Sequence, residues 1–229
     1  MAERNSTMLV RAAVFDFDLT LADSTAGVIE CVNHALLGLG LAPAEPSAIR
    51  QTVGLSLPRT LEMLIGVSDL ERASEFYQRF VERADQVMAD LTVMFPEVPE
   101  TLSKLRALGI RTAIVSTKFR YRIQSILARE SLVKAFDVIV GGEDVTQHKP
   151  DPEGLISALG RLGVEAADAV YVGDHPVDAE AAARAGIRFI AVLTGTSRLG
   201  DFSGHEVAGV LSSLSELPGA LRGPASMPQ

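Results

Sequence analysis

The sequence is poor in cysteine and in aromatic residues. It has one cysteine, no tryptophan and 5% aromatic residues in 229 positions. A single cysteine excludes an internal disulfide and suits a reducing compartment, so we expect a cytoplasmic protein. Cys31 falls on the apolar side of a predicted helix, where we expect a buried packing residue rather than a reactive thiol.

Basic residues are also in the minority. The 21 Lys and Arg are outnumbered by 29 Asp and Glu, which gives a formal net charge of −8. We therefore expect no broad nucleic-acid surface. No apolar run is long enough to cross a bilayer, and the first seven residues lack the apolar stretch of a secretory signal, so we expect no membrane partner. With 47% apolar residues, the chain can still build a full core.

Three common catalytic signatures are missing. The chain has no Gly-x4-Gly-Lys-Ser/Thr loop, no Gly-x-Gly-x-x-Gly turn that opens a helix after a strand, and no serine-centred nucleophile elbow. The sequence therefore shows no sign of a P-loop, a dinucleotide-binding turn or an α/β-hydrolase nucleophile.

What the chain does have is a pair of closely spaced carboxylates. Residues 14 to 20 read Val-Phe-Asp-Phe-Asp-Leu-Thr, an apolar run followed by two acids and a hydroxyl. Side chains at i and i+2 of an extended strand share a face, so we expect Asp16 and Asp18 to point the same way. Two like charges this close are costly unless a cation or a shared proton compensates them. The pattern predicts a metal-assisted active site.

From Pro96 onward, helical and β-rich segments alternate. The predicted strands are 111–116, 136–140, 169–173, 187–193 and an edge strand at 207–211. The predicted helices are 98–108, 119–129, 153–162, 176–185 and 214–221. Repeated strand–helix crossovers predict an α/β fold with a three-layer, Rossmann-like parallel sheet. We expect the last residues, 223–229, to be disordered.

The block after the first strand reads as all-helical. Helix-like stretches cover 28–39, 49–53, 57–65 and 73–91. We find no strand signal between about residues 22 and 90. The predicted layout is an α/β catalytic core of residues 1–21 and 91–229 with an inserted helical cap domain at 22–90. The two linkers, near 21–24 and 90–95, can act as a hinge.

Polar and charged residues follow the predicted strands. In open α/β sheets, ligands bind at the carboxyl ends of the strands. The residues at these ends are Asp16, Asp18 and Thr20, then Ser116, Thr117 and Lys118, then Glu143 and Asp144, then Asp174, His175 and Asp178. Lys149 precedes a rigid Pro-x-Pro segment between the third and fourth strands. We expect most of these residues to converge, with Glu143 and Asp144 as solvated turn residues.

Four of these stretches resemble the ordered motifs of the haloacid dehalogenase superfamily. They are Asp16-Phe17-Asp18-Leu19-Thr20, Ser116, Lys149-Pro150, and Gly173-Asp174 with Asp178. The resemblance covers nearly the whole chain, including a helical cap directly after the first motif. Within the superfamily the chain looks most like the phosphoglycolate phosphatase-like branch, which residues 95–102 and 116–118 support.

Two positions depart from the family pattern. Leu19 stands where glycine is common, which suggests that this turn does not need a glycine-only backbone. His175 stands where a small residue is usual. Neither change touches the carboxylates.

The resemblance implies a Mg²⁺-dependent phosphatase that acts through an aspartyl phosphate. Asp16 would attack phosphorus, and Asp18 would protonate the leaving oxygen and then activate water. The metal ligands would be the side chains of Asp16 and Asp174 and the backbone carbonyl of Asp18. Ser116 would hydrogen-bond a phosphoryl oxygen, and Lys149 would stabilise its charge.

Two residues are expected to support this site, and two of the assignments have structural alternatives. Thr20 would steady the loop, and Asp178 would orient Lys149 or metal-bound water. Asp178 could instead be a first-turn acid of a helix, and Ser116 could cap the next helix.

Candidates for binding the rest of the substrate are weaker. They are Thr117 and Lys118 in the core, with Ser56 and Arg59 in the cap, the last two on cap position alone. His148 and His175 flank the site, but neither has metal-ligand spacing with a partner, so we assign them only a local electrostatic role.

The leading hypothesis is a phosphatase for a small phosphorylated substrate, with phosphoglycolate as the first choice. Inorganic pyrophosphatase and phosphosugar phosphatase or mutase are alternatives of the same branch. An inactive binding or scaffold protein is a third reading, which the intact Asp16, Asp18, Lys149 and Asp174 disfavour. A dehalogenase is disfavoured because the resemblance implies that such members lack the second acid.

Overall fold

The structure, a computed structural model, describes residues 10–66 and 70–222. The tail that we expected to be disordered, 223–229, lies outside the described residues, as do the first seven residues, which we examined for a signal. Among the helices of the described residues, none combines the length and the apolar character that crossing a bilayer requires.

The centre of the molecule is a six-stranded parallel sheet. Its order is β5-β4-β1-β6-β7-β8, and every neighbouring pair is parallel. The strands are β1 Ala12–Phe15, β4 Arg111–Val115, β5 Val138–Val140, β6 Ala169–Gly173, β7 Arg188–Val192 and β8 Gly209–Leu211. The chain reverses its direction of winding at β1, which lies between β4 and β6. This strand order places the first strand at the switch point where open α/β sheets bind ligands.

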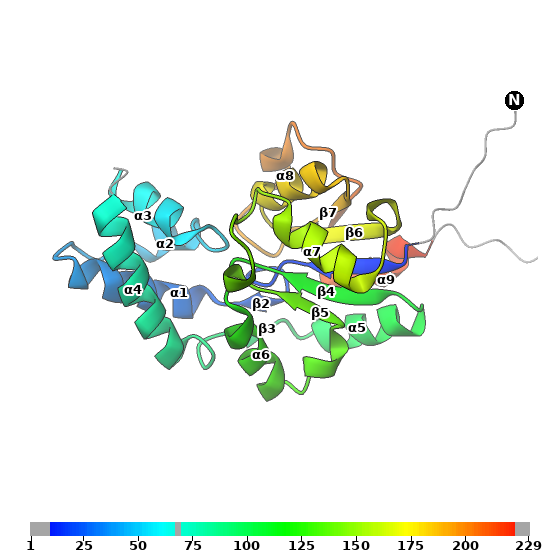
Figure 1. Cartoon of the computed structure of the whole chain (residues 1–229), viewed down its shortest axis with the longest axis horizontal. Helices are drawn as coiled ribbons and strands as arrows, with labels where there is room; N and C mark the ends of the chain where they lie inside the picture. Colours follow the sequence, from blue (N-terminus) through cyan, green and yellow to red (C-terminus); the bar gives the residue numbers. More distant parts are fainter. Residues whose placement is uncertain (1–9, 67–69, 223–229) are drawn as a thin grey trace, which may run out of the picture.

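Helices cover both faces of the sheet, as Figure 1 shows. One side carries α5 Val98–Ala107, α6 Arg120–Arg129 and α9 Leu217–Leu221, and the other carries α7 Glu153–Leu162 and α8 Pro176–Ala185. Alternate residues of β1 pack against the helices on opposite faces of the sheet. Ala13 and Phe15 belong to one apolar cluster, and Ala12 and Val14 belong to the other. The three-layer α/β prediction is confirmed. Short 3₁₀ turns connect the elements: η1 Val133–Ala135, η2 Gly142–Asp144, η3 Ala166–Asp168, η4 Leu199–Phe202 and η5 Leu214–Glu216.

Four helices form a separate unit beside the sheet. They are α1 Thr25–Gly38, α2 Pro46–Arg50, α3 Leu57–Ile65 and α4 Leu70–Val87. Their apolar faces enclose a core of their own, in which Cys31 is fully buried as expected. Figure 1 shows this unit, which we call the cap, lying to one side of the sheet. The domain boundaries themselves remain a prediction.

The expectation of no strand between residues 22 and 90 is wrong at one edge. Ala22–Asp23 forms β2, which pairs antiparallel with β3, Val93–Met94. The two predicted linkers are therefore hydrogen-bonded to each other. Two residues are too short to leave a period-2 pattern in the sequence, so the pairing could not be seen there.

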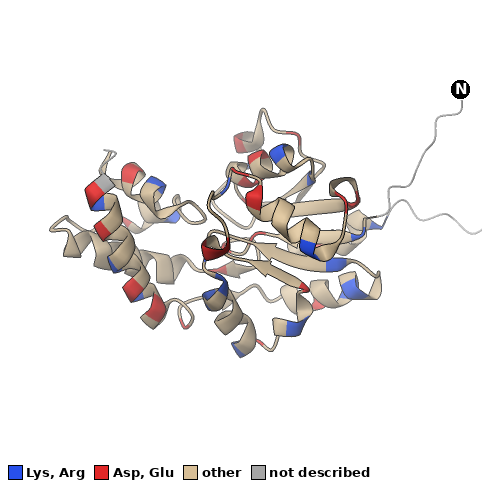
Figure 2. Ribbon diagram, viewed as in Figure 1, with Lys and Arg blue, Asp and Glu red and all other residues tan. Residues whose placement is uncertain are grey.

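Charged residues are spread over both parts of the molecule. In Figure 2 the Lys and Arg positions lie interspersed with Asp and Glu positions on the cap and on the core helices. The prediction that the chain does not bind nucleic acid stays a prediction.

Candidate active site

The site begins where β1 ends. The Asp16 backbone N–H donates to the Val172 carbonyl of β6 at 2.9 Å, which extends the sheet by one residue and fixes the acid at its edge. Asp16 is 2% exposed and Asp18 5%. Both carboxyls are thus held in the interior, where a charge needs a partner.

Leu19 adopts the backbone conformation that glycine prefers. Its φ is +60°, in the left-handed region that glycine favours and that a residue with a Cβ adopts at a cost of roughly 1–2 kcal/mol, so the turn does not require glycine but does strain the residue that replaces it. The side chain of Leu19 is buried and belongs to the apolar core of the cap. We infer that this packing compensates for the strained backbone, and that it ties the loop carrying Asp18 to the cap.

Lys149 joins two of the predicted acids. Its Nζ lies 2.8 Å from Asp16 Oδ1 and 2.6 Å from Asp178 Oδ1, and it donates to the hydroxyl of Tyr171 at 3.2 Å. The Tyr171 hydroxyl also donates to the Val115 carbonyl at 3.2 Å. Lys149 is therefore fixed between β4 and β6, directly beside Asp16. The structure brings Asp16, Lys149 and Asp178 together.

Burial dominates the protonation of this group. It raises the pKa of Asp16 to about 7; the Lys149 ammonium opposes the rise, while Asp178 and Asp18 add to it. Burial alone would lower the pKa of Lys149, but the adjacent Asp16 and Asp178 carboxylates hold it well above its usual value. The two carboxylates therefore favour the charged form of Lys149.

Asp174 follows β6 and faces the same space. Thr20 donates from its hydroxyl to Asp174 Oδ1 at 3.0 Å, so Thr20 connects the β1 loop to the β6 loop. Burial, followed by the nearby Asp178 and Asp16 charges, raises the pKa of Asp174 well above its usual range. Carboxylate oxygens of Asp16, Asp174 and Asp178 all lie within 4.8 Å of one another, and all three side chains are buried.

These residues fit a divalent cation. Among the described residues, the buried acids Asp16, Asp18, Asp174 and Asp178 have Lys118 and Lys149 as their close cations, so the site would carry an excess of about two negative charges when all four acids are ionised. An all-oxygen donor set is the kind that Mg²⁺ prefers. The backbone also keeps the space next to Asp174 clear, because a Cβ on Gly195 would lie 1.9 Å from Asp174 Oδ2.

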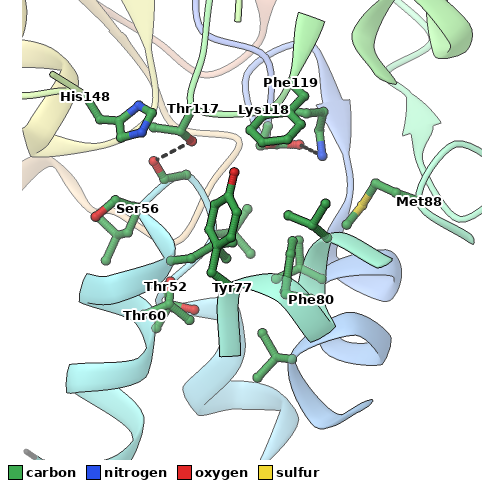
Figure 3. Close-up of a pocket in the computed structure, with 18 of the residues that line it drawn as sticks. Thr52, Ser56, Thr60, Tyr77, Phe80, Met88, Thr117, Lys118, Phe119 and His148 are labelled. Atoms are coloured by element: carbon green, nitrogen blue, oxygen red, sulfur yellow. Dashed lines mark hydrogen bonds and ion pairs between the residues drawn. The ribbon is translucent and has the colours of Figure 1, made fainter. Parts of the chain in front are cut away.

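The residues after β4 link the core to the cap. Ser116 is buried, and its hydroxyl accepts from the Lys118 backbone N–H at 3.3 Å. Thr117 donates from its hydroxyl to the Gly54 carbonyl of the cap at 3.2 Å. The Lys118 Nζ lies 3.1 Å from Asp18 Oδ1, and both of these side chains are nearly inaccessible to solvent. Figure 3 shows the last two contacts as dashed lines beside a cavity.

That cavity lies between cap and core and measures about 250 Å³. Asp18, Thr117 and Lys118 line it from the core, and Ser56 lines it from the cap. Arg59 is not among the lining residues. Its guanidinium instead pairs with Glu62 at 2.6 Å, and both of these side chains are exposed.

The two histidines that flank the site have different positions: His175 caps a helix, and His148 lines the cavity. The Nδ1 of His175 accepts from the Val177 N–H at 3.1 Å and so caps α8, and the His175 backbone N–H donates to Asp178 Oδ2 at 3.2 Å. Asp178 is thus both a first-turn acid and a partner of Lys149. Burial lowers the pKa of His148, which lines the cavity.

The two acids of η2 do not reach the site's centre. Glu143 accepts from the Arg120 backbone N–H at 2.8 Å, and Asp144 pairs with the Arg120 side chain at 2.8 Å. They position the start of α6.

Sequence reasoning missed three contributors. Tyr171 lies in an apolar strand and is fully buried. Its hydroxyl was the one indication of a role, because a buried tyrosine hydroxyl needs a hydrogen-bond partner. Arg122, on α6, is 6% exposed and pairs with Asp85 of α4. Gly195 follows β7 and reads in the sequence as an ordinary turn residue. The structure shows that it leaves room for the Asp174 carboxylate, which a Cβ at this position would contact.

Comparison with known proteins gives a consistent result. A family model described as haloacid dehalogenase-like hydrolase matches residues 13–192. A phosphoglycolate phosphatase of Pseudomonas fluorescens is 31% identical over 221 residues, covering 93% of this chain and 80% of the relative. One from Cereibacter sphaeroides is 34% identical over 215 residues, covering 91% and 96%. A crystal structure of a protein described as a haloacid dehalogenase-like hydrolase from Bacteroides fragilis has a TM-score of 0.88 at 38% identity, covering 91% of this chain and 99% of that one.

Proposed function

The chain belongs to the haloacid dehalogenase-like hydrolases, and from that premise we propose that it is a phosphatase that cleaves a small phosphate monoester through a phosphorylated Asp16. The observation that carries the proposal is the contact of Asp16 Oδ1 with Lys149 Nζ at 2.8 Å. This contact places a carboxylate nucleophile next to a buried cation that can neutralise phosphoryl oxygens.

In the first step, an Asp16 carboxylate oxygen attacks phosphorus and the bond from phosphorus to the ester oxygen breaks. The leaving oxygen takes a proton from Asp18. In the second step, water attacks the phosphorus of phospho-Asp16, gives its proton to Asp18, and the bond from Asp16 to phosphorus breaks. Asp18 suits both transfers because it lines the cavity on the side where the leaving group must lie.

Other residues would orient Lys149 and Asp174 and would neutralise the charge of the phosphoryl group. Asp178 and Tyr171 hold Lys149 in place, and Thr20 holds Asp174. We assign Ser116 to a phosphoryl oxygen, since it is the hydroxyl that ends β4 next to Lys118. Asp16, Asp174 and the backbone carbonyl of Asp18 would hold Mg²⁺, which supplies charge neutralisation to the phosphoryl group when bound. The cap excludes water from the first step.

The names of the two curated relatives make phosphoglycolate the first ester to test. Pyrophosphate and phosphosugars remain alternatives that the same buried acids and Lys149 would serve. A panel of these phosphates separates them, because a mutase isomerises its substrate without net release of phosphate.

The decisive experiment uses Asp16→Asn, with Asp90→Asn as the control. Both variants lose one negative charge, but Asp90 is exposed, whereas Asp16 is buried beside Lys149. We expect phosphate release from p-nitrophenyl phosphate in Mg²⁺ to fall at least about a thousandfold in Asp16→Asn, and not in Asp90→Asn. Acid-quenched wild-type enzyme should carry phosphate on the peptide that contains Asp16. Turnover that survives in Asp16→Asn, or that persists fully in EDTA, would disprove the mechanism.

A further inference from the structure

The cavity between cap and core lies where the leaving group of a phosphate ester would be held. It borders Asp18, which we propose as the proton donor, and it does not reach Asp16. At about 250 Å³, it is far larger than the roughly 10–15 Å³ that a single water molecule needs. A two-carbon acid, with five non-hydrogen atoms, would occupy only part of it.

Apolar groups make up most of its wall. Figure 3 shows Tyr77 and Phe80 of α4 reaching up from the cap, with Met88 beside them and Phe119 above. The rings of Tyr77 and Phe119 lie 6.4 Å apart between centroids, so the cap and the core each contribute an aromatic face. Such a wall favours an apolar ligand body, because every methylene that it covers is removed from water.

The cations that line the cavity already have partners. Among the described lining residues these are Lys118, whose ammonium pairs with Asp18 at 3.1 Å, and Arg122, whose guanidinium pairs with Asp85 at 2.7 Å. Arg122 also donates to the Val81 carbonyl at 3.0 Å. Because the charge of each cation is already compensated by an acid, a carboxylate on the leaving group would add a further, uncompensated negative charge to a largely apolar cavity, which is unfavourable.

We infer, on the premise that the chain is a phosphatase, that its substrate is the phosphate monoester of an uncharged alcohol with an apolar alkyl or aryl body. The leaving group occupies the aromatic-walled cavity with its ester oxygen toward Asp18. The two-carbon carboxylate of phosphoglycolate is then a poor fit, although relatives of the chain carry that substrate in their names.

The test compares esters whose alcohols have similar leaving ability. With ethyl, n-propyl, n-butyl and n-hexyl phosphate, we expect kcat/KM of the full chain in Mg²⁺ to rise about threefold per added methylene until the cavity is filled. n-Propyl phosphate should exceed phosphoglycolate, which has nearly the same size, by at least about tenfold.

Two variants assign the effect to the cavity. Tyr77→Ala should flatten the rise with chain length, whereas Met63→Ala, which removes an exposed apolar side chain of the same cap outside the cavity, should preserve it. Leu55→Lys places a cation in the wall and should raise phosphoglycolate turnover relative to n-butyl phosphate about tenfold. Leu55→Met is its uncharged control.

The outcomes separate this inference from the proposed function. Phosphoglycolate preferred over n-propyl phosphate, or a chain-length series that stays flat in wild type, overturns the assignment of the cavity while the phosphatase stands. An unchanged rise in Tyr77→Ala has the same consequence. Failure to release phosphate from every ester, p-nitrophenyl phosphate included, overturns the phosphatase and the cavity assignment with it.

Discussion

The guanidinium of Arg122 on α6 lies 2.7 Å from the carboxylate of Asp85 on α4, so an ion pair joins the core to the cap. The Arg122 side chain is 7% exposed and lies over the rings of Phe119 and Tyr121 at 4.9 and 5.2 Å, whereas the Asp85 side chain is 47% exposed. Tyr121 donates from its hydroxyl to the same carboxylate at 2.5 Å. Because the core side of this contact is preorganised and buried, we expect it to favour the position of the cap seen here.

Removing the carboxylate of Asp85 tests that contact. In Asp85→Ala, Arg122 keeps only the Val81 carbonyl as a partner on the cap, so the cap should spend less time against the core. We expect kcat/KM to fall about threefold to tenfold and the free energy of unfolding to fall by about 1–3 kcal/mol, because the buried Arg122 guanidinium loses its charged partner. Steady-state kinetics and urea unfolding measure the two effects.

The control is Glu82→Ala, which removes an exposed acid from the same helix. A similar loss of kcat/KM in both variants would show that helix charge, and not the pair with Arg122, is responsible.

At position 19 we expect glycine to be tolerated better than alanine, the reverse of the usual order, because the backbone there is left-handed. Leu19→Ala removes a buried side chain at a cost of about 2–5 kcal/mol and keeps a left-handed backbone that costs about 1–2 kcal/mol for a residue with a Cβ. Leu19→Gly loses the same packing but relieves the backbone. We therefore expect Leu19→Gly to be more stable than Leu19→Ala by about 1 kcal/mol, measured by urea unfolding. The opposite order would mean that the turn is not strained.

Features that could be predicted from the sequence are those that leave a local pattern. The apolar run into Asp16 and the alternation of helices and strands after Pro96 are such patterns, and the parallel sheet follows from them. Lys149 was predictable because a resemblance supplied its role. The strand ends then determined which residues meet, since parallel strands share one carboxyl edge.

Contacts between distant elements left no such pattern. Arg122 and Asp85 lie 37 positions apart on two amphipathic helices, where each reads as an ordinary polar residue. Tyr171 reads as a core residue of an apolar strand, although its hydroxyl holds Lys149. Arg59 shows the converse, because a position in the cap turn does not determine which way a side chain points.

Gly195 should be required for metal binding rather than for folding. A Cβ at this position would lie 1.9 Å from Asp174 Oδ2, so Gly195→Ala must displace that carboxylate. We expect the affinity for Mg²⁺, measured by calorimetric titration, to fall about tenfold or more. Gly200→Ala is the matched control, because a Cβ there meets open space. Unchanged Mg²⁺ affinity in Gly195→Ala would remove Asp174 from the proposed metal ligands.

The buried acids make the stability of the metal-free protein depend on pH in an unusual direction. Burial raises the pKa of Asp16 to about 7 and that of Asp174 well above its usual range, whereas both carboxyls titrate near about 3.9 in the unfolded chain. Between these values the folded protein binds more protons than the unfolded one. The contribution of these groups is therefore fully present below about pH 4 and is lost as pH rises, for Asp16 through about 7.

Mg²⁺ should reverse this loss, because the cation replaces the protons as the counter-charge. In the metal-free protein at constant ionic strength, we expect these two acids to lower Tm by a few degrees between pH 5 and pH 8, at about 2–4 °C per kcal/mol for a chain of this size. Mg²⁺ should raise Tm clearly at pH 8 and little at pH 5, where protons compete for the same oxygens. Asp174→Asn, which removes one titrating group, should be less sensitive to both pH and Mg²⁺. Equal stabilisation by Mg²⁺ at both pH values would place its binding site away from these carboxylates.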